Sequence, residues 1–392
     1  MQLSTYFTNF FNNSRSSGIV LILCVIISLG IANTSLKDSF QAFLDLRAGT
    51  DFLHLNYSVS TWINDGLMAV FFLLVGLEIK REIIEGELSS FKNASLPIFA
   101  ALGGMIVPAV IYSLLNTGTQ YSNGWGIPMA TDIAFSLAIV SLLGTKVPPS
   151  IKIFLAALAI VDDLGAILVI AIFYTEQIHW TYLLLSAGVA LLLFILNFLK
   201  VKKIFFYIIP GLALWYFLHH SGIHATIAGV VLAFSIPTNT SHIIISPLEK
   251  LEHQLHKPVN FLIMPIFALA NTNITFSSGM ASSLTSSLGI GIIAGLVLGK
   301  LIGINLFSFL AIRLKLSALP QNSSWLQMAG TGLLAGIGFT MSIFIALLSF
   351  KNNIEIQNDA KFAILIASVL AGSLGFLILK TSSDKKSQQE IQ

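Results

Sequence analysis

The chain alternates long apolar runs with short polar breaks along nearly its whole length. Most of these runs are long enough to cross a hydrocarbon core of about 30 Å as a helix, whereas the seventh and eighth are short. Twelve runs are predicted as spans: 17–33, 58–79, 95–115, 122–143, 153–175, 180–199, 204–218, 222–236, 258–275, 287–312, 324–349 and 358–380. The pattern predicts an all-α polytopic membrane protein with about 12 transmembrane helices.

The composition narrows the class of protein further. Of the 392 residues 55% are apolar and only 10% are charged, whereas a soluble domain has about 25% charged residues. The net charge of +3 is small and dispersed, which argues against a nucleic-acid partner. The single cysteine, Cys24, lies in the first apolar run, so the sequence indicates neither a disulfide framework nor a thiolate metal site.

The distribution of positive charge predicts the orientation in the membrane. The chain has 21 Lys and Arg residues. If both termini are cytoplasmic, only Lys37, Arg47, Lys351 and Lys361 lie on the outer side of the membrane. Lys300 lies within a span, and the other Lys and Arg residues lie on the cytoplasmic side. This positive-inside bias predicts cytoplasmic termini and an even number of spans, with membrane lipid as the surroundings.

Three regions follow from the pattern. We expect residues 1–16 to form an N-terminal interfacial segment, residues 17–380 the transmembrane domain, and residues 381–392 a polar, disordered cytoplasmic tail. The outer segment 36–57 mixes charged and β-favouring residues. It therefore favours a short hairpin, which offers a contact for a homodimer.

Four ionisable side chains lie near the centres of predicted spans. Asp162 and Asp163 occupy the middle of 153–175, Asp132 the middle of 122–143, and Lys300 the middle of 287–312. One carboxylate at that depth costs at least about 2.5 kcal/mol. Lys300 is about 18 Å from the nearer interface, beyond the reach of its side chain. The common depth predicts one cluster on a route for protons or cations.

Each of these residues also has a purely structural interpretation. Asp132 could cap a helix where the chain breaks, and it could do so with or without a role in ion binding. Asp162 or Asp163 would form a buried salt bridge with Lys300, which also suits a transporter whose substrate competes with the lysine. Snorkelling to the interface is the remaining alternative for Lys300.

The paired carboxylates suggest a simple exchange chemistry. Consecutive helical residues point about 100° apart, so that one aspartate faces a water-filled cavity while the other faces a neighbouring helix. Such a carboxylate holds a proton or a hard cation, but not both. Competition between the two ions for one site is sufficient for exchange.

Two predicted spans contain breaks. Pro128 removes a helical hydrogen bond shortly before Thr131 and Asp132, and the eleventh span has glycines from Gly330 to Gly338 at mid-depth. Interrupted segments in corresponding halves point to a transporter site. They predict two discontinuous helices and inverted repeats at 95–175 and 287–380. In the tenth span, glycines recur every four residues and permit close helix contact: Gly291, Gly295, Gly299 and Gly303.

Several stretches resemble the NhaA-type bacterial sodium/proton antiporter family, and the resemblance extends from Gly18 to about Lys380. The most specific are 72–82 (FLLVGLEIKRE), 130–135 (ATDIAF), 159–165 (AIVDDLG), 222–226 (GIHAT), 251–253 (LEH) and 299–300 (GK). The resemblance implies that Asp162 and Asp163 bind the cation and the protons. It also implies that Asp132 and Lys300 balance helix dipoles where two broken helices cross, while Thr131 lends an oxygen.

The same resemblance implies a set of residues for pH control. A cytoplasmic group would comprise Glu78, Arg81, Glu82, Glu252, His253 and His256, and His224 would take part in the pH response. From the residues alone, Glu78, Arg81 and Glu82 share one helical face, which is equally typical of a surface salt-bridge patch. Histidine titrates near neutral pH.

These patterns favour a secondary Na⁺(Li⁺)/H⁺ antiporter in a bacterial inner membrane, without a cofactor. Two carboxylates that release protons to bind one cation predict electrogenic exchange of two protons per cation. An intramembrane aspartyl hydrolase is disfavoured because its glycine–aspartate motif is absent, and because Lys300 would disturb a shared-proton pair. A channel is the other alternative, since broken helices also occur in channels.

Overall fold

The computed structural model describes residues 14–175, 177–239, 245–276 and 279–389, and nearly all of its regular structure is helical. The chain forms two compact units: the first comprises residues 1–19, 87–166 and 274–392, and the second comprises residues 20–86 and 167–273. Two helices, α2 (Ser14–Ala32) and α8 (Pro149–Phe173), contribute residues to both units.

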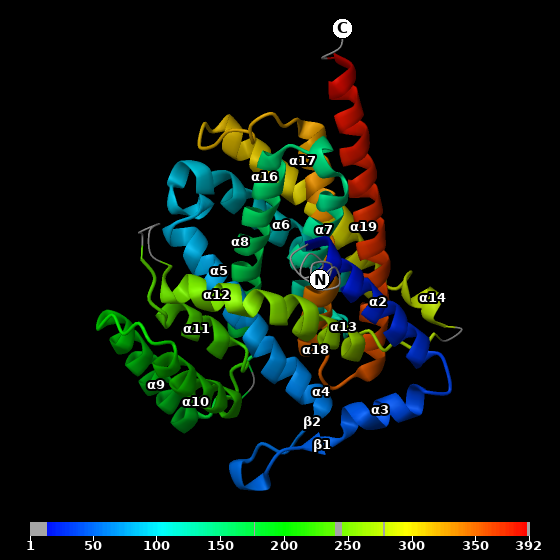
Figure 1. Cartoon of the computed structure of the whole chain (residues 1–392). Helices are drawn as coiled ribbons and strands as arrows, with labels where there is room; N and C mark the ends of the chain where they lie inside the picture. Colours follow the sequence, from blue (N-terminus) through cyan, green and yellow to red (C-terminus); the bar gives the residue numbers. More distant parts are fainter. Residues whose placement is uncertain (1–13, 176, 240–244, 277–278, 390–392) are drawn as a thin grey trace, which may run out of the picture. The chain divides into compact units, whose positions relative to one another are not determined.

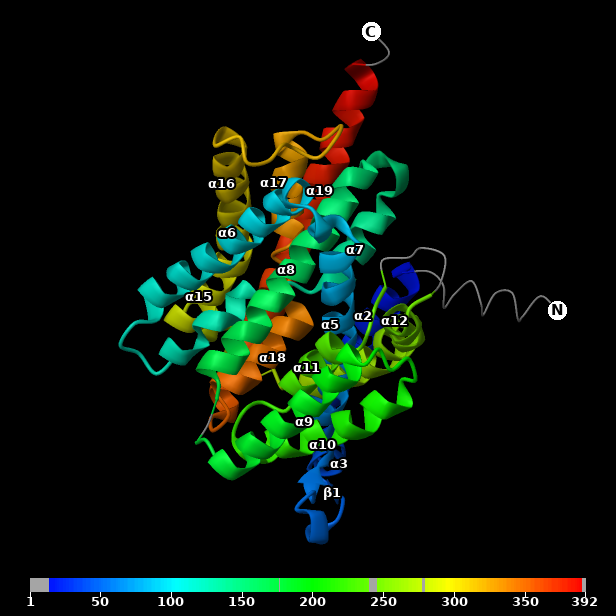
Figure 2. The same cartoon turned by 90° about the vertical axis from the view of Figure 1, so that its left-hand side faces the viewer.

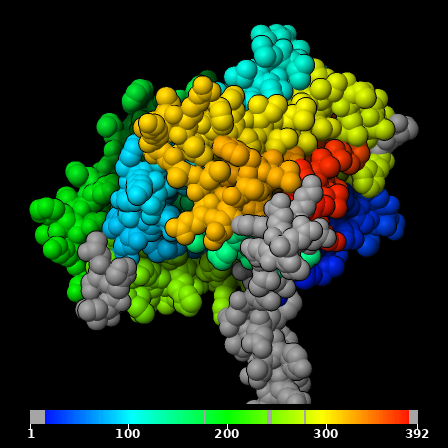
Figure 3. All heavy atoms as spheres, turned by 90° about the horizontal axis from the view of Figure 1, so that it is seen from above, coloured from blue at the N-terminus to red at the C-terminus, as the bar shows by residue number. Residues whose placement is uncertain are grey.

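The first unit contains residues 95–166 of the first predicted repeat and all of the second, 287–380. Its further elements are η3 (Glu87–Ser89), α6 (Phe91–Asn116), η4 (Ser122–Met129), α7 (Ile133–Leu142), η5 (Gly144–Lys146), α14 (Met280–Ser283), α15 (Ser287–Ala294), η7 (Gly295–Gly299), α16 (Lys300–Arg313), α17 (Trp325–Leu334), α18 (Phe339–Ser349) and α19 (Ile354–Gln389). Helix α17 packs against both α16 and α19 (Figure 1). Figure 3 shows the yellow-to-orange residues of α16 and α17 next to the red residues of α19.

The second unit combines a helical bundle with a small hairpin. Its further elements are α3 (Lys37–Asp45), β1 (Arg47–Ala48), η1 (Asp51–Leu53), β2 (Tyr57–Ser58), α4 (Val59–Thr61), η2 (Trp62–Leu67), α5 (Met68–Ile84), α9 (Trp180–Phe198), α10 (Phe205–Ser221), α11 (Ile227–Ser235), α12 (Pro247–Pro258), η6 (Val259–Ile263) and α13 (Met264–Asn271). Strands β1 and β2 pair antiparallel, with Arg47 opposite Ser58. The predicted hairpin in the outer segment is therefore present, although its strands are only two residues long.

The helices account for a multi-pass membrane protein. Within the described residues, 6 helices are long and apolar enough to cross a membrane, and 2 bent helix pairs also pass this test, which gives up to 8 spans. Exposed leucines such as Leu184 and Leu191 cover the outside of α9, as expected of a lipid-facing helix. The all-α polytopic class is confirmed, whereas the number of twelve spans stays a prediction.

The glycine stripe of the tenth predicted span lies at a close helix crossing. A Cβ atom on Gly303 of α16 would lie 2.1 Å from the carbonyl oxygen of Gly103 in α6. One on Gly299 would lie 2.9 Å from the Cα atom of Pro108. Figure 2 shows α6 and α16 side by side. Because only glycine permits this backbone approach, the prediction of close contact is confirmed.

Two breaks interrupt helices of the first unit near the predicted positions. Residues 130–132 are extended between η4 and α7, directly after Pro128. Residues 335–338 separate α17 from α18, whose axes differ by 47°. Both helix pairs are therefore discontinuous, and each break exposes helix-end donors and acceptors.

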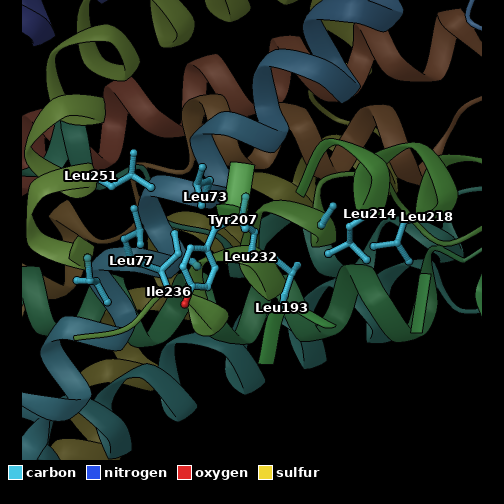
Figure 4. Close-up of a cluster of buried hydrophobic side chains, with 12 residues drawn as sticks. Leu73, Leu77, Leu193, Tyr207, Leu214, Leu218, Leu232, Ile236 and Leu251 are labelled. Carbon is cyan, nitrogen blue, oxygen red and sulfur yellow. The ribbon is translucent and has the colours of Figure 1, made fainter. Parts of the chain in front are cut away.

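Leucine side chains dominate the core of the second unit. Leu73 and Leu77 of α5 pack with Tyr207 of α10, Leu232 of α11 and Ile236, which follows α11 (Figure 4). Leu251 of α12 completes the left side of this cluster in the same view. With Leu193 of α9, the cluster joins five helices of the second unit.

The two ends of the chain differ from their predicted description or lie beyond it. Helix α19 continues to Gln389, through most of the tail that composition predicts to be disordered. Residues 381–389 contain neither glycine nor proline, so nothing ends the helix after its last span. Of the predicted N-terminal interfacial segment, residues 1–13 lie outside the described residues, and α2 begins at Ser14.

Candidate functional site

Asp162 of α8 lies at the centre of a buried polar cluster in the first unit. Its Oδ2 atom accepts a hydrogen bond from the Lys300 Nζ atom and lies 2.6 Å from the Thr131 hydroxyl. Lys300 and Thr131 are 0% exposed and Asp162 is 1% exposed. Lys300 therefore does not snorkel; its ammonium forms the buried salt bridge that the sequence offered as one alternative.

The other carboxylate oxygen of Asp162 has a different environment. Within the described part of the chain, Oδ1 accepts no hydrogen bond, although it is buried. A buried carboxylate oxygen without a donor is unfavourable. It is also a position at which a proton or a hard cation would gain a strong interaction.

Thr131 lies in the first break and contacts three polar groups. Its hydroxyl is 2.7 Å from the Ala335 carbonyl oxygen in the second break, and it accepts a hydrogen bond from Lys300 Nζ at 3.0 Å. A hydroxyl has one hydrogen to donate. Its donor bond is therefore made either to Asp162 or to Ala335.

Asp132 caps two helices at once. Its Oδ1 atom accepts the backbone N–H of Phe135 in α7 at 3.1 Å, and its Oδ2 atom accepts the backbone N–H of Thr340 in α18 at 3.2 Å. The Thr340 hydroxyl also donates to Oδ2. Both contacts are with the first turn of a helix, where the partial charge is positive. The capping role that the sequence offered for Asp132 is thus present.

The two breaks are held together by further hydrogen bonds. The backbone N–H of Asp132 donates to the Ile337 carbonyl oxygen at 2.6 Å, and Ser136 Oγ donates to the Leu334 carbonyl oxygen at 2.8 Å. Ser342 Oγ of α18 donates to the carbonyl oxygen of Ile127 in η4 at 2.8 Å. Backbone groups that the breaks leave without helical partners are satisfied in this way.

Asp163 and the start of α16 also belong to the region around Asp162. Asp163 follows Asp162 on α8, is 2% exposed, and its charge acts on the Lys300 ammonium. Lys300 begins α16 directly after the π-helical turn η7. Such π-bulges are frequent at functional sites. The four predicted ionisable residues therefore belong to one region, together with Thr131.

Four members of the predicted pH-control group gather in the second unit. Arg81 Nη1 is 2.8 Å from Glu82 Oε1, and Arg81 Nε donates to both carboxylate oxygens of Glu252 at 3.0 Å. Glu78 is within electrostatic range of these groups. Burial raises the pKa of Glu252, and the Arg81 charge opposes this rise. His253 and His256 lie on α12 with Glu252, and both are exposed.

His224 belongs to another cluster of the second unit. Its Nε2 atom is 3.7 Å from Asp65 Oδ1, and its Nδ1 atom is 2.8 Å from the Thr226 hydroxyl. On the other side of Asp65, His219 Nδ1 is 3.6 Å from Oδ2. His224, a member of the predicted pH set, thus shares the Asp65 carboxylate with His219. The sequence assigned no role to His219.

Sequence reasoning missed Thr340 and Lys80. Thr340 lies in α18, two residues after Gly338. A threonine therefore follows the second break, whereas Thr131 lies within the first, and the repeat could have revealed it. Lys80 donates two hydrogen bonds to the end of α11. No local pattern signals contacts between residues so distant in the sequence.

Comparisons with known proteins identify similar chains. The sequence profile described as Na+/H+ antiporter 1 matches residues 8–379. The Na(+)/H(+) antiporter NhaA 2 of Flavobacterium johnsoniae is 59% identical over 386 residues, which cover 98% of this chain and 94% of that protein. The Na(+)/H(+) antiporter NhaA of Flavobacterium psychrophilum is 51% identical, with 97% of each chain covered. The Na(+)/H(+) antiporter NhaA of Cytophaga hutchinsonii is 49% identical, with 100% of this chain and 99% of that protein covered.

Proposed function

The chain belongs to the Na+/H+ antiporter 1 family, and from this premise we propose that it carries sodium ions out of the cell in exchange for protons. The relatives are named for this exchange. Antiporters are transporters rather than enzymes, so the proposed reaction is a movement of ions without a change of covalent bonds.

The buried Asp162–Lys300 pair is the observation that carries the assignment to particular residues. The ammonium occupies Asp162 Oδ2 in a region that excludes water, and Oδ1 accepts no hydrogen bond from the described residues. In our proposal, a Na⁺ or Li⁺ ion bound by Asp162 and Asp163 replaces the ammonium as the partner of the carboxylate. Thr131 supplies a further oxygen, and Asp132 and Lys300 balance the charges of the helix ends.

The proposed stoichiometry follows from counting protons in the empty and loaded sites. Asp162 and Lys300 together hold one proton while they are paired, and Asp163 holds a second. Binding of one Na⁺ to both carboxylates would release two protons. Asp163 gives up one, because a carboxylate does not bind a proton and a hard cation at the same oxygens. Lys300 gives up the other, once Na⁺ has replaced its ammonium beside Asp162. One positive charge then crosses the membrane per cycle, and exchange is electrogenic.

We assign pH regulation to the Glu78–Arg81–Glu82–Glu252 group, with His253, His256 and His224 as further contributors. The raised pKa of Glu252 supports this assignment, because a group that titrates closer to neutral pH responds to cellular changes. Protonation of Glu252 would remove the charge that pairs with Arg81. The contact between α12 and α5 would then weaken.

The proposed setting is a bacterial inner membrane with both termini in the cytoplasm. The positive-inside bias supports this orientation. Exposed apolar side chains along the spans support contact with lipid. We further propose that the outer segment 36–57, which carries the β1–β2 hairpin, joins two copies of the chain.

Reconstituted vesicles test the proposal directly. Proteoliposomes with an imposed pH gradient receive Na⁺, Li⁺ or K⁺, and a pH-sensitive dye reports loss of the gradient. With the unaltered protein, we expect Na⁺ and Li⁺ to dissipate the pH gradient. With Asp162→Asn or Asp163→Asn, the gradient should decay no faster than in empty vesicles. Asp38→Asn is the matched control, because Asp38 lies exposed on α3; it should behave like the unaltered protein.

Different results would reject different parts of the proposal. Normal exchange by both aspartate variants would reject the site. Exchange that is unaffected by a clamped membrane potential would reject the two-proton stoichiometry. Single-channel currents without coupling to pH would favour the channel alternative.

A further inference from the structure

Lys80 makes an unusual pair of contacts at the end of α5. The residue follows the second predicted span and is only 8% exposed. Its Nζ atom donates to the carbonyl oxygen of Phe234 at 2.8 Å and also to that of Ile236. Phe234 is in the last turn of α11 and Ile236 follows that helix. Lys80 therefore satisfies carbonyl groups that the end of a helix leaves without partners.

These contacts complete a close seam between α5 and α11. A Cβ atom on Gly229 of α11 would lie 2.2 Å from the carbonyl oxygen of Ala69 in α5. One on Gly76 would lie 2.7 Å from the Cβ atom of Ala233. Lys80 follows Gly76 by one helical turn and so lies on the same face. The two helices are thus in backbone contact along the seam, and Lys80 fixes its end.

The acceptors of Lys80 lie against the apolar core of the second unit. Ile236 is 0% exposed and packs in the cluster with Leu77 and Tyr207 (Figure 4). Water has little access to this position, so a carbonyl group there that loses its donor stays unsatisfied. Loss of such a partner is more unfavourable than loss of an exposed hydrogen bond.

The set of partners suits an uncharged amine. Within the described part of the chain, Lys80 forms no ion pair with a carboxylate, and its two acceptors are neutral carbonyl oxygens. A neutral amine has two N–H groups, which equals the number of acceptors. An ammonium there gains from the negative end of the α11 dipole, but it keeps a third donor and has no carboxylate partner, so burial still disfavours the charged form.

Other titratable groups surround this position without pairing with Lys80. On α5 these are Glu78, Arg81 and Glu82, and Glu85 caps its end, where it accepts a hydrogen bond from Thr238. On α12 they are Glu249, which is used in the helix cap, and Glu252, which pairs with Arg81. His253 and His256 of α12 are exposed, Tyr207 donates to the Val201 carbonyl oxygen, and α11 itself has no titratable side chain.

We propose that Lys80 is a positioning residue of the antiporter: it holds the C-terminal end of α11 against α5, and holds it most firmly when its amine is uncharged. The hydrogen-bonded contact depends only on the geometry above, whereas its effect on ion exchange rests on the proposed function. Because burial disfavours the charged form, the contact strengthens as Lys80 loses its proton.

The direction of the pH dependence follows from the pKa of Lys80. Burial lowers this pKa from 10.5 to about 8. When the end of α11 opens, Lys80 meets water and its pKa returns toward 10.5. Because the open state then binds the proton more tightly, a rise in pH favours the closed state between these two values. The closed state gains at most about tenfold in population ratio per pH unit.

Hydrogen–deuterium exchange of the intact protein in detergent tests this proposal. Peptides that cover α11 and Ile236 are followed from about pH 7 to about pH 10, with rates corrected for the intrinsic effect of pH. In the unaltered protein, protection should rise steadily above about pH 8, by up to about tenfold per pH unit. Lys80→Arg stays charged over this range and should show no such rise. Lys80→Met has no donor and should show low protection at every pH.

The controls separate titration from a purely structural effect. Lys250→Arg, at an exposed lysine of α12, should follow the unaltered protein. A flat profile in the unaltered protein, or an equal rise in Lys80→Arg, would overturn the proposal. If Lys80→Met fails to fold, Lys80→Arg still decides between these outcomes.

Vesicle transport then tests whether the contact affects exchange. In Lys80→Arg, the rate of Na⁺/H⁺ exchange should lose the pH dependence that the unaltered protein shows above about pH 8. Lys250→Arg should retain this pH dependence. If deuterium exchange follows the expected pattern but the protein moves no Na⁺, the proposed function would be rejected. The proposal for the Lys80 contact would still hold. Normal transport profiles in Lys80→Arg would reject the role in exchange.

Discussion

At the scale of single residues, the Thr131 hydroxyl is the most sharply testable part of the site. It lies 2.6 Å from Asp162 Oδ2 and 2.7 Å from the Ala335 carbonyl oxygen, but it can donate to only one of them. If a cation takes up the charge of Asp162, as proposed, the hydroxyl would be released to bind Ala335 and to turn an oxygen lone pair toward the ion. Thr131 thus links ion binding to the second break.

Replacement of Thr131 should weaken ion binding rather than abolish transport. Thr131→Val keeps the shape but removes a hydrogen bond worth about 1.4 kcal/mol, so the Na⁺ concentration for half-maximal exchange should rise about tenfold. Thr131→Ser retains the hydroxyl and should stay within about threefold of the unaltered protein. Dye assays over a range of Na⁺ concentrations measure both values. Equal concentrations for the valine and serine variants would show that the hydroxyl has no part in binding.

At the scale of elements, the crossing of α6 and α16 depends on glycine. A methyl group on Gly303 would meet the Gly103 carbonyl oxygen at 2.1 Å, so Gly303→Ala must push the two helices apart. Such overpacking costs about 1–3 kcal/mol, and we expect a lower midpoint of thermal unfolding in detergent. Gly188→Ala on α9 is the control, because no atom lies within 4 Å of its new Cβ. It should leave the midpoint unchanged or raise it slightly through better helix propensity.

A second consequence of Gly303→Ala concerns the site itself. Lys300 lies one helical turn before Gly303 on α16, and its ammonium contacts Asp162. A displaced α16 should therefore reduce exchange as well as stability. An unfolding midpoint equal to that of the unaltered protein would contradict the close packing of α6 and α16.

The sequence predicted those features whose cause lies in local chemistry. Pro128 removes a helical hydrogen bond just before Thr131 and Asp132, and Gly303 permits close approach, so the break and the crossing could both be inferred. Buried charge is so unfavourable that Asp162 and Lys300 had to find partners. By contrast, the contact of Asp132 with Thr340, and that of Lys80 with Phe234, join residues far apart in the chain. Only the folded arrangement determines such pairs.

The helical tail shows the opposite limit of sequence reasoning. Residues 381–389 are polar, and low hydrophobicity alone indicates disorder. They directly continue a long helix, however, and each added residue extends an existing ladder without a new nucleation step. The structure therefore carries α19 to Gln389, where composition predicts no regular structure.

At the scale of the whole molecule, the two units divide the candidate functions between them. The Asp162 cluster lies in the first unit, and the Arg81 and His224 clusters lie in the second. Helix α8 carries Asp162 and Asp163 and continues past Ala166 into the second unit. Helix α8 therefore joins the two units covalently, a few residues after Asp162 and Asp163.

The exposed tip of the outer segment carries two apolar side chains that a second copy of the chain would cover in a dimer. Phe52 is 93% exposed and the adjacent Leu53 is 47% exposed, and exposed apolar groups of this kind mark interaction surfaces. If this tip binds a second copy, Phe52→Ser combined with Leu53→Ser should convert a dimer to a monomer in light scattering of the detergent-solubilised protein, with unfolding little changed. Phe91→Ser, at a phenylalanine that is 73% exposed at the start of α6, should keep the dimer. An unaltered mass in the double variant would exclude the hairpin as the contact, because removal of its two most exposed apolar side chains should cost such an interface most of its burial energy.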